Sequence, residues 1–304
     1  MTKSASASIP PAVTVLAPAK INLILRILDR RADGYHNLWS IMQTVGLEDE
    51  LQIRRSDSSP DIRLQCDSAQ LAGDRSNLVY KAAAAVMERV PHKVGLDIQL
   101  RKAIPMGAGL GGGSSDAAAT ILGLNHVLRL GWTQREMAEV AQPLGSDVPF
   151  FLYAPTASVA GRGELVRPVS VTGSKWVVLV NPGFGVETKW AYQELGTTRN
   201  AIRPLSDLHR SLEQGQELSW SQLAACAEND FEVPVFAKHP LLRQIKQTLL
   251  DQGAEIALLS GSGATVFGLF ASEAVAQRAV RGFTAQAQLK TFVVPTSCGP
   301  LIRR

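Results

Sequence analysis

The chain has 304 residues, of which 45% are apolar and 19% charged, so it can bury a sizeable core and its length favours two domains. No apolar run approaches the roughly 20 residues that a membrane-spanning helix needs, which argues against a membrane protein. The formal charge of +4 comes from scattered basic residues, so the basic stripe of a nucleic-acid-binding protein is missing, while small anionic ligands fit equally well.

The chain opens with a polar segment, residues 1–11, that has neither the hydrophobic core of a secretory signal nor the Arg-rich pattern of a transit peptide. We expect it to be a flexible tail. The three cysteines, Cys66, Cys226 and Cys298, are far apart and lack the spacing of metal ligands. A reducing compartment, the cytoplasm, therefore fits best.

The first elements along the chain predict a sheet. The apolar segment 13–16 and the alternating segment 21–25 are interpreted as early strands of one sheet. Residues 30–36 carry an Asp-Gly turn signal between two apolar stretches. We expect a loop there that presents Tyr35 and His36 outward.

The middle of the chain predicts helices around a glycine-rich segment. Strong helix formers predict a helix from residue 77 to 90, and the alternation at 96–100 predicts a strand. The glycine-rich residues 105–116 follow, and a helix is expected at 117–128. A further helix is expected at 134–141.

The C-terminal part alternates strands with helices such as 241–252, which indicates an α+β sandwich and not a doubly wound sheet. The short polar stretch 170–175 precedes an apolar strand and is interpreted as a linker. We therefore expect an N-terminal domain over 1–172 and a C-terminal domain over 173–304.

The segment PMGAGLGGGSSD, residues 105–116, is the strongest chemical signal. Its five glycines let the backbone approach an anion, and the N-terminus of the following helix favours negative charge. Ser114 and Ser115 add hydroxyl donors or a magnesium ligand. A glycine-rich turn that only permits close packing is the alternative, but five glycines before two serines favour phosphate.

Three other features stay ambiguous on local sequence. Asp147, in the turn LGSDVPFF, is a candidate general base, although a helix-capping or turn-forming role is the commoner one. Lys20 precedes a strand, and such a lysine is usually a solvated surface charge. The SGSG turn at 260–263 is typical of a hairpin, but two glycine loops in one chain favour convergence on a polyphosphate.

Taken in order, these segments resemble the GHMP kinase superfamily, whose three motifs fall at residues 17–25, 105–119 and 259–267. The resemblance spans nearly the whole chain and includes the Asn229-Asp230 pair. The segments RADGYH and GGGSSD are similar to the branch that phosphorylates a small molecule, a cytidine diphosphate-linked methylerythritol. The family otherwise carries a shorter GLGSSA-type loop.

The resemblance implies an α+β GHMP kinase architecture, with an N-terminal domain like ribosomal protein S5 domain 2 and a ferredoxin-like C-terminal domain. It implies ATP and Mg²⁺ as cofactors, although no residue is assigned as a metal ligand. It also implies a cytoplasmic enzyme of isoprenoid biosynthesis, a monomer or weak homodimer, with no nucleic-acid or membrane partner.

The resemblance assigns Lys20 and Asp147 as the catalytic pair. Asp147 would accept the proton of the substrate's C2 hydroxyl, and Lys20 would keep the carboxylate ionised. The N-terminal domain would bind ATP and hold the catalytic residues, and the C-terminal domain would bind the substrate. Asn77 and Lys102 would contact the adenine of ATP, and the other ATP-binding residues would be Pro105, Gly107, Gly109, Gly111, Gly112, Gly113, Ser114 and Ser115. The substrate-binding residues would be Asn22, Tyr35, His36, Thr188, Tyr192, Gly261, Ser262 and Gly263.

Two alternatives belong to different classes. One is another small-molecule kinase of the superfamily, such as a homoserine or mevalonate kinase. The other is a catalytically silent nucleotide-binding protein that keeps the glycine loop. The presence of both Lys20 and Asp147 argues against the silent protein, which is expected to lack one of them.

Overall fold

The structure of the protein is a computed structural model that describes residues 12–56, 59–68, 71–91, 94–153, 155–198, 203–214, 217–284, 286–297 and 299–303. The expected tail at residues 1–11 and the thiol of Cys298 lie outside these residues. Cys66 and Cys226 carry free thiols. Among the helices of the described ranges, none combines the length and the apolar character needed to cross a membrane.

Two long antiparallel strands, β1 (Ala12–Arg30) and β2 (His36–Ser56), form the centre of an eight-stranded sheet. The two strands predicted at 13–16 and 21–25 are therefore one strand, and the loop expected between 30 and 36 joins β1 to β2. Around this pair lie β3 (Ile62–Cys66), β4 (Gly95–Arg101), β5 (Thr156–Gly161), β6 (Leu165–Pro168), β10 (Glu228–Asn229) and β14 (Leu301–Arg303).

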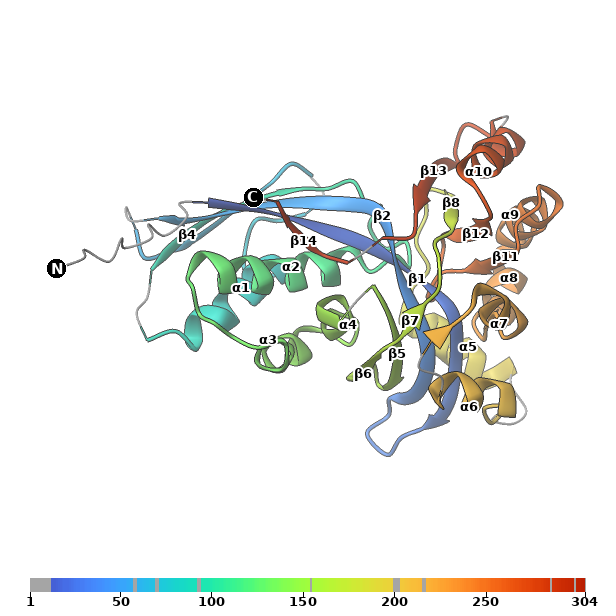
Figure 1. Ribbon diagram of the computed structural model, residues 1–304, viewed down its shortest axis with the longest axis horizontal. Helices are drawn as coiled ribbons and strands as arrows, with labels where there is room; N and C mark the ends of the chain where they lie inside the picture. Colours follow the sequence, from blue (N-terminus) through green and yellow to red (C-terminus); the bar gives the residue numbers. More distant parts are fainter. Residues whose placement is uncertain are drawn as a thin grey trace.

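Helices cover one face of this sheet (Figure 1). They are α1 (Leu78–Glu88), α2 (Gly112–Val127), α3 (Gln134–Ala141), the short η1 (Gln142–Leu144) and α4 (Val148–Tyr153). The helix at 134–141 is confirmed at its predicted bounds, since a capping box between Thr133 and Glu136 fixes its start. Asn77 caps α1 and accepts the amide hydrogen of Val79.

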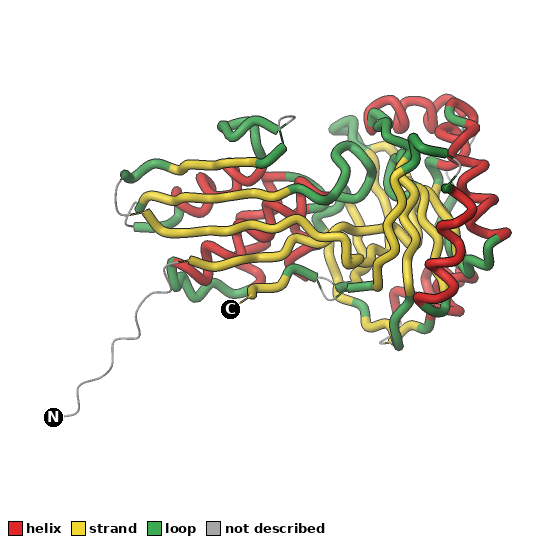
Figure 2. The backbone as a smooth tube through the Cα atoms, turned by 90° about the horizontal axis from the view of Figure 1, so that it is seen from above, coloured by secondary structure: helices red, strands yellow, loops and turns green. Residues whose placement is uncertain are grey.

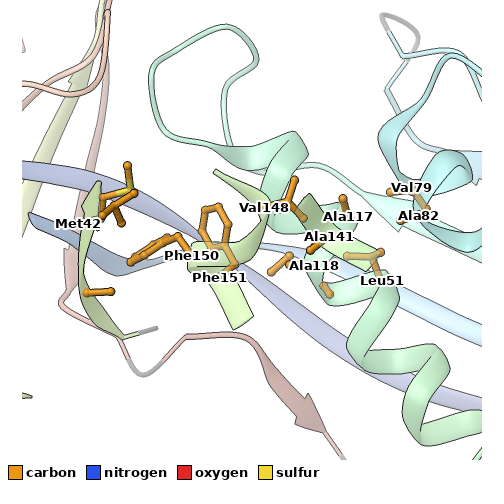
Figure 3. Close-up of a cluster of buried hydrophobic side chains, with 14 of the residues drawn as sticks. Met42, Leu51, Val79, Ala82, Ala117, Ala118, Ala141, Val148, Phe150 and Phe151 are labelled. Carbon is orange, nitrogen blue, oxygen red and sulfur yellow. The ribbon is translucent and has the colours of Figure 1, made fainter. Parts of the chain in front are cut away.

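The glycine-rich helix α2 begins five residues earlier than the predicted 117, at Gly112. Glycine has low helix propensity, but the first turn packs so closely that a Cβ at Gly112 would lie 3.0 Å from Ile104. Tertiary packing therefore overrides the local preference. The apolar cluster beneath the sheet includes Phe150 and Phe151 of α4 and Ala117 of α2 (Figure 3).

The C-terminal part contains a second, antiparallel sheet with the order β11-β12-β8-β13. Its first strand along the chain lies between the third and the fourth, and α9 and α10 pack on the sheet, which is the ferredoxin-like arrangement that was expected (Figure 2). Its strands are β8 (Trp176–Asn181), β11 (Ile256–Leu259), β12 (Val266–Phe270) and β13 (Lys290–Pro295).

The remaining elements surround this second sheet. They are β7 (Ser170–Val171), α5 (Thr188–Thr198), α6 (Asp207–Gln214), β9 (Glu217–Leu218), α7 (Trp220–Ala225), α8 (Glu232–Lys238), α9 (Pro240–Asp251), α10 (Glu273–Val280) and η2 (Arg281–Phe283). The helix predicted at 241–252 is thus confirmed within one residue at each end.

The two parts of the chain share strands. Both β10 and β14 come from beyond residue 172, yet β10 pairs with the second half of β1 and β14 with its first half. A buried apolar cluster also joins Ile21 and Trp39 of the long strands to Leu258 and Phe267 of the second sheet. The domain division at 172/173 stays a prediction, and the shared strands hold the two parts against each other at the site.

Candidate active site

Lys20 and Asp147 form an ion pair, with 3.4 Å between Nζ and Oδ2. The pairing of β1 with β2 shifts register on both sides of Lys20, after Pro18 and after Asn22, and such irregularities re-aim side chains. The Lys20 side chain is 5% exposed and that of Asp147 31%. Lys20 is therefore not the solvated surface charge of the local alternative, and Asp147 is the member of the pair that a ligand can reach.

The stem of Lys20 lies between the two glycine turns. A Cβ at Gly111 would lie 3.0 Å from Lys20 Cγ, and a Cβ at Gly261 would lie 3.5 Å from Lys20 Nζ. The backbone amide of Lys20 also donates to the carbonyl of Leu110 at 2.9 Å. The ion pair is thus adjacent to both glycine segments.

Asn22 is the partner that holds Lys20. Its Oδ1 accepts from Lys20 Nζ at 2.7 Å and from the amide of Gly261 at 3.0 Å. Its Nδ2 donates to Ser40 Oγ at 2.9 Å. Only 1% of Asn22 is exposed, so the structure shows this side chain contacting other residues of the protein. A direct contact of Asn22 with the substrate stays a prediction.

The SGSG turn at 260–263 connects the antiparallel strands β11 and β12, so the hairpin interpretation is confirmed. The turn also packs on the first glycine loop. Ser260 Oγ donates to the carbonyl of Gly109 at 2.9 Å, and Thr265 N donates to that of Ala108 at 3.1 Å. A Cβ at Gly109 would lie 2.0 Å from the Ser260 carbonyl oxygen, so this approach requires glycine.

A cavity of about 420 Å³ follows the first glycine loop. The helix α2 begins at it, and Gly111 caps the helix in the left-handed conformation. The first helical bond runs from Ser115 N to Gly111 O, which leaves the preceding amides free for an anion. The cavity lining contains these predicted ATP-binding residues: Asn77, Lys102, Pro105, Gly107, Gly109, Gly111, Gly112, Gly113 and Ser114.

Ser115 differs from the other predicted ATP-binding residues. It is fully buried, does not line the cavity, and its Oγ has no hydrogen-bond partner. Ser115 is the fourth residue of α2, and its side chain is enclosed by the protein. A contact between Ser115 and ATP stays a prediction.

Lys102 joins the two ends of the glycine loop. Its ammonium pairs with the Asp49 carboxylate and, at 2.6 Å, with Asp116 Oδ2. Asp49 Oδ1 also accepts the amides of Ala103 and Ile104, at 2.6 and 2.9 Å. Asp49 therefore fixes the entry of the loop and Asp116 its exit, with the ammonium between them.

Burial raises the pKa of Asp116, the Lys102 ammonium opposes this by pairing with the carboxylate, and the nearby Asp49 carboxylate acts in the same direction as burial. Sequence reasoning assigned Lys102 to the adenine and did not identify Asp49 or Asp116 as site residues. Asp116 ends the GGGSSD segment, which was a usable signal. Asp49 lies in a strand of mixed residues and offers none.

A group of aromatic residues includes Tyr192, which lies close enough to Asp147 to feel its charge. Tyr35 is 56% exposed, and the Arg162 guanidinium lies 3.8 Å from the centre of its ring. His36 stacks on Tyr192, with 5.1 Å between ring centres and 19° between planes. Burial raises the pKa of Tyr192 to about 12, and the charge of Asp147 contributes, so Tyr192 stays neutral.

The remaining predicted substrate-binding residues lie around the SGSG turn. Thr188 begins α5, and its Oγ1 lies 2.9 Å from Ser262 Oγ. Gly261 and Gly263 both have positive φ, of 57° and 99°, which allows the tight turn. Arg162 was not predicted, because an isolated arginine in a turn gives no signal without the ring it covers.

Two protein families match this chain. The family of GHMP kinases N terminal domains matches residues 77–155, and that of GHMP kinases C terminal domains matches residues 206–288. The chain belongs to the GHMP kinase family. The first match covers most of the glycine-loop cavity and Asp147, and the second covers the SGSG turn, so both matched regions contribute residues to the site.

Individual relatives share a narrower name. The chain is 43% identical over 265 residues to a 4-diphosphocytidyl-2-C-methyl-D-erythritol kinase of Citrifermentans bemidjiense, covering 87% of this chain and 92% of the relative. It is 41% identical over 281 residues to the enzyme of that name from Syntrophotalea carbinolica, covering 92% and 97%.

Solved structures agree with this GHMP kinase fold. A crystal structure of 4-(cytidine 5'-diphospho)-2C-methyl-D-erythritol kinase matches with a TM-score of 0.76 and 32% identity, covering 94% of this chain and 100% of that one. Homoserine kinase from Cytophaga hutchinsonii matches with a TM-score of 0.77 but only 21% identity, covering 99% and 100%, so it supports the fold alone.

Proposed function

We propose that this GHMP kinase transfers the γ-phosphoryl group of ATP to the C2 hydroxyl of 4-diphosphocytidyl-2-C-methyl-D-erythritol, giving the 2-phosphate and ADP. The observation that carries the proposal is the Lys20–Asp147 ion pair beside the two joined glycine turns. The choice of alcohol rests on relatives, 41–43% identical to this chain, that are named 4-diphosphocytidyl-2-C-methyl-D-erythritol kinase.

The roles of the catalytic pair follow from its geometry. Asp147 accepts the proton of the C2 hydroxyl while that oxygen forms a bond to the γ-phosphorus and the bond from phosphorus to the β–γ bridging oxygen breaks. Lys20 pairs with the carboxylate and offsets charge on the transferred group. Because the chemistry of phosphoryl transfer is mostly positioning and electrostatics, one carboxylate and one ammonium suffice next to a well-formed anion loop.

The glycine-loop cavity is the ATP site in this proposal. The amides of residues 112 to 114 lack partners within α2 and carry the positive end of its dipole, which suits the β- and γ-phosphates. Asn77 and Lys102 line the same cavity, and Lys102 Nζ lies close to Gly112 and pairs with Asp116. A contact of these two residues with the adenine stays a prediction.

One residue of this cavity also fits Mg²⁺. Asp116 lines the cavity, its Oδ1 is a buried oxygen atom without a hydrogen-bond partner, and Mg²⁺ prefers oxygen ligands. The described residues contain no cluster of three or more His, Cys, Asp or Glu side chains for a protein-only site. The ion would therefore be shared with the ATP phosphates, whose developing negative charge it would neutralise.

The aromatic side of the site is assigned to the cytidine diphosphate group. The exposed ring of Tyr35, backed by Arg162, gives a platform for stacking of the pyrimidine. His36 and Tyr192 present polar atoms beside it. Thr188, Gly261, Ser262 and Gly263 would contact the part of the substrate nearest the reacting hydroxyl.

Competition among alcohols tests the proposal. The purified protein is incubated with ATP, Mg²⁺ and, in turn, the cytidine diphosphate-linked alcohol, homoserine or mevalonate, and ADP release is measured. We expect turnover with the first compound alone, and phosphorus NMR should place the new phosphate on C2. Turnover with homoserine or mevalonate instead would overturn the assignment of the acceptor.

A further inference from the structure

Asn229 is a buried polar residue that the proposed mechanism does not use. It lies on the two-residue strand β10, opposite Leu25 of β1, and is 5% exposed. It belongs to the Asn229-Asp230 pair that carries part of the family resemblance. Its side-chain contacts point toward the catalytic lysine.

The Asn229 carboxamide clamps the SGSG turn. Its Nδ2 donates to the carbonyls of Leu259 and Gly261, both at 2.8 Å, and its Oδ1 accepts the amide of Phe231 at 2.9 Å. These two carbonyls flank the peptide bond between residues 260 and 261. Asn229 therefore holds the backbone on both sides of the peptide that carries the Gly261 N–H, while the carbonyl of that peptide accepts the amide of Gly263 at 2.9 Å.

The Gly261 N–H leads to the reacting groups. It donates to Asn22 Oδ1 at 3.0 Å, and the same oxygen accepts from Lys20 Nζ at 2.7 Å. Lys20 Nζ in turn lies 3.4 Å from Asp147 Oδ2. A continuous chain of polar contacts thus runs from β10 to the carboxylate.

We propose that Asn229 is a positioning residue, which fixes the Gly261 peptide so that Asn22 holds Lys20 against Asp147. The proposal rests on the function proposed for this pair. Asn22 is the essential link, because its single Oδ1 accepts from both the turn and the lysine. A shift of the turn therefore moves the ammonium.

The chemistry of an amide explains why asparagine occupies this position. Two carbonyls and one amide face the side chain, so it must offer two donors and one acceptor. Aspartate would bring a carboxylate against two carbonyl oxygens. Alanine would leave both carbonyls unsatisfied in a buried place, so the turn would move to find other partners.

Asp230, the residue directly after β10, provides a control. Its Oδ2 accepts the amide of Ile27 at 2.8 Å and the Arg26 guanidinium at 3.4 Å, and its Oδ1 pairs with Arg203. These contacts anchor β10 to β1 but do not reach the SGSG turn. If the Asn229-Asp230 pair had a purely structural role, Asp230→Asn and Asn229→Ala would change kcat to a similar extent.

The first experiment compares kcat and the KM for ATP in Asn229→Ala and Asp230→Asn, after thermal melting has shown that both are folded. We expect kcat of Asn229→Ala to fall by roughly 10- to 100-fold with little change in the KM for ATP, because misplacement of a catalytic group affects the transition state. Asp230→Asn should lower the melting temperature while keeping kcat. Equal effects of the two variants on kcat overturn the proposal.

A double-mutant cycle tests the route through Asn22. If the route is correct, Asn22→Ala/Asn229→Ala has the kcat of Asn22→Ala alone, within about threefold, whereas independent effects multiply. Multiplication overturns the proposal. If Asn229→Ala does not fold, it is replaced by Asn229→Ser, which keeps one donor. The fall in kcat should then have the same pattern but be smaller.

The acceptor is the alcohol that the wild-type protein phosphorylates. If the wild-type protein phosphorylates a different alcohol, the proposed substrate is wrong. The double-mutant cycle measured with that alcohol still decides the role of Asn229. A wild-type protein that phosphorylates no alcohol overturns both proposals.

Discussion

The ammonium of Lys20 lies 3.4 Å from the carboxylate of Asp147, although one residue belongs to the long strand β1 and the other to the turn before α4. Neither position is a strong signal on its own. Their approach beside two glycine turns defines a place where an alcohol can lose a proton while a phosphate is held. The following predictions depend on this relationship and on the contacts that maintain it.

Replacement of Asp147 by asparagine removes the proposed base and keeps the side-chain size. We expect kcat to fall by ~10²-fold or more, because general-base catalysis contributes at least that much, with ATP binding nearly intact. Steady-state kinetics and calorimetry with ATP measure the two effects. Asp207→Asn, at a fully exposed position, is the control. Near-normal turnover of Asp147→Asn would remove this residue from the base role.

Loss of the Tyr35 ring should weaken capture of the cytidine diphosphate group. Base stacking on an aromatic ring is worth ~1–3 kcal/mol, so the KM for the alcohol substrate should rise by about 5- to 150-fold in Tyr35→Ala. The KM for ATP should not change, since the ring lies outside the glycine-loop cavity. Tyr35→Phe keeps the ring and serves as the control. An unchanged KM for the alcohol in Tyr35→Ala would count against stacking.

The contact between the two glycine turns predicts a sharp difference between two glycines of similar backbone conformation. Gly109 and Gly131 have φ of 77° and 67°, but only at Gly109 would a Cβ collide, at 2.0 Å from the Ser260 oxygen. Gly131→Ala should cost about 1–2 kcal/mol of stability and leave catalysis unchanged. Gly109→Ala must separate the turns, so we expect a KM for ATP at least ~10-fold higher.

Kinetics and denaturant unfolding of both alanine variants check this expectation. Similar KM values for ATP in the two variants would show that the turns do not need to touch.

The buried ammonium of Lys102 predicts a stability effect with a rescue. Lys102→Met leaves the Asp49 and Asp116 carboxylates buried without their cation, which should cost ~3–5 kcal/mol of unfolding free energy. Adding Asp116→Asn removes one of the two charges and should restore part of that loss. Guanidinium unfolding measures both values.

The control for this experiment is Lys175→Met, because the Lys175 ion pair with Glu255 is partly exposed and should contribute ~1 kcal/mol or less. A double variant less stable than Lys102→Met would contradict the explanation by unpaired buried charge.

Much of the fold was predictable from local sequence. The capping box at Thr133 and Glu136 and the periodicity that follows fix α3 without help from the rest of the chain. The start of α2 was misplaced, since glycine propensity argues against a helix that close packing on Ile104 nevertheless permits. The continuity of β1 was missed because Pro18 interrupts the local strand pattern, while pairing with β2 carries the strand through it.

The site divides in the same way. Sequence motifs predicted the members of the proposed catalytic pair, the glycine loop and the aromatic residues Tyr35, His36 and Tyr192, and the roles of these residues stay predictions. They did not predict Asp49 or Arg162. Asp49 is recognised by its buried ion pair with Lys102, and Arg162 by its contact with the Tyr35 ring, and both contacts appear only in the structure. They also placed Lys102 at the adenine, without its two carboxylate partners.

The amino-acid sequence by itself determined that residues 105–116 have the glycine-rich composition that suits an anion, because small residues and a helix start are properties of a continuous segment. Its ordered motifs also determined the family. Only the tertiary structure decided that Lys20 meets Asp147, that Lys102 closes the glycine loop and that Asn229 reaches Gly261. Those contacts join distant segments, and they form only when packing of the whole chain compensates the entropy of bringing the segments together.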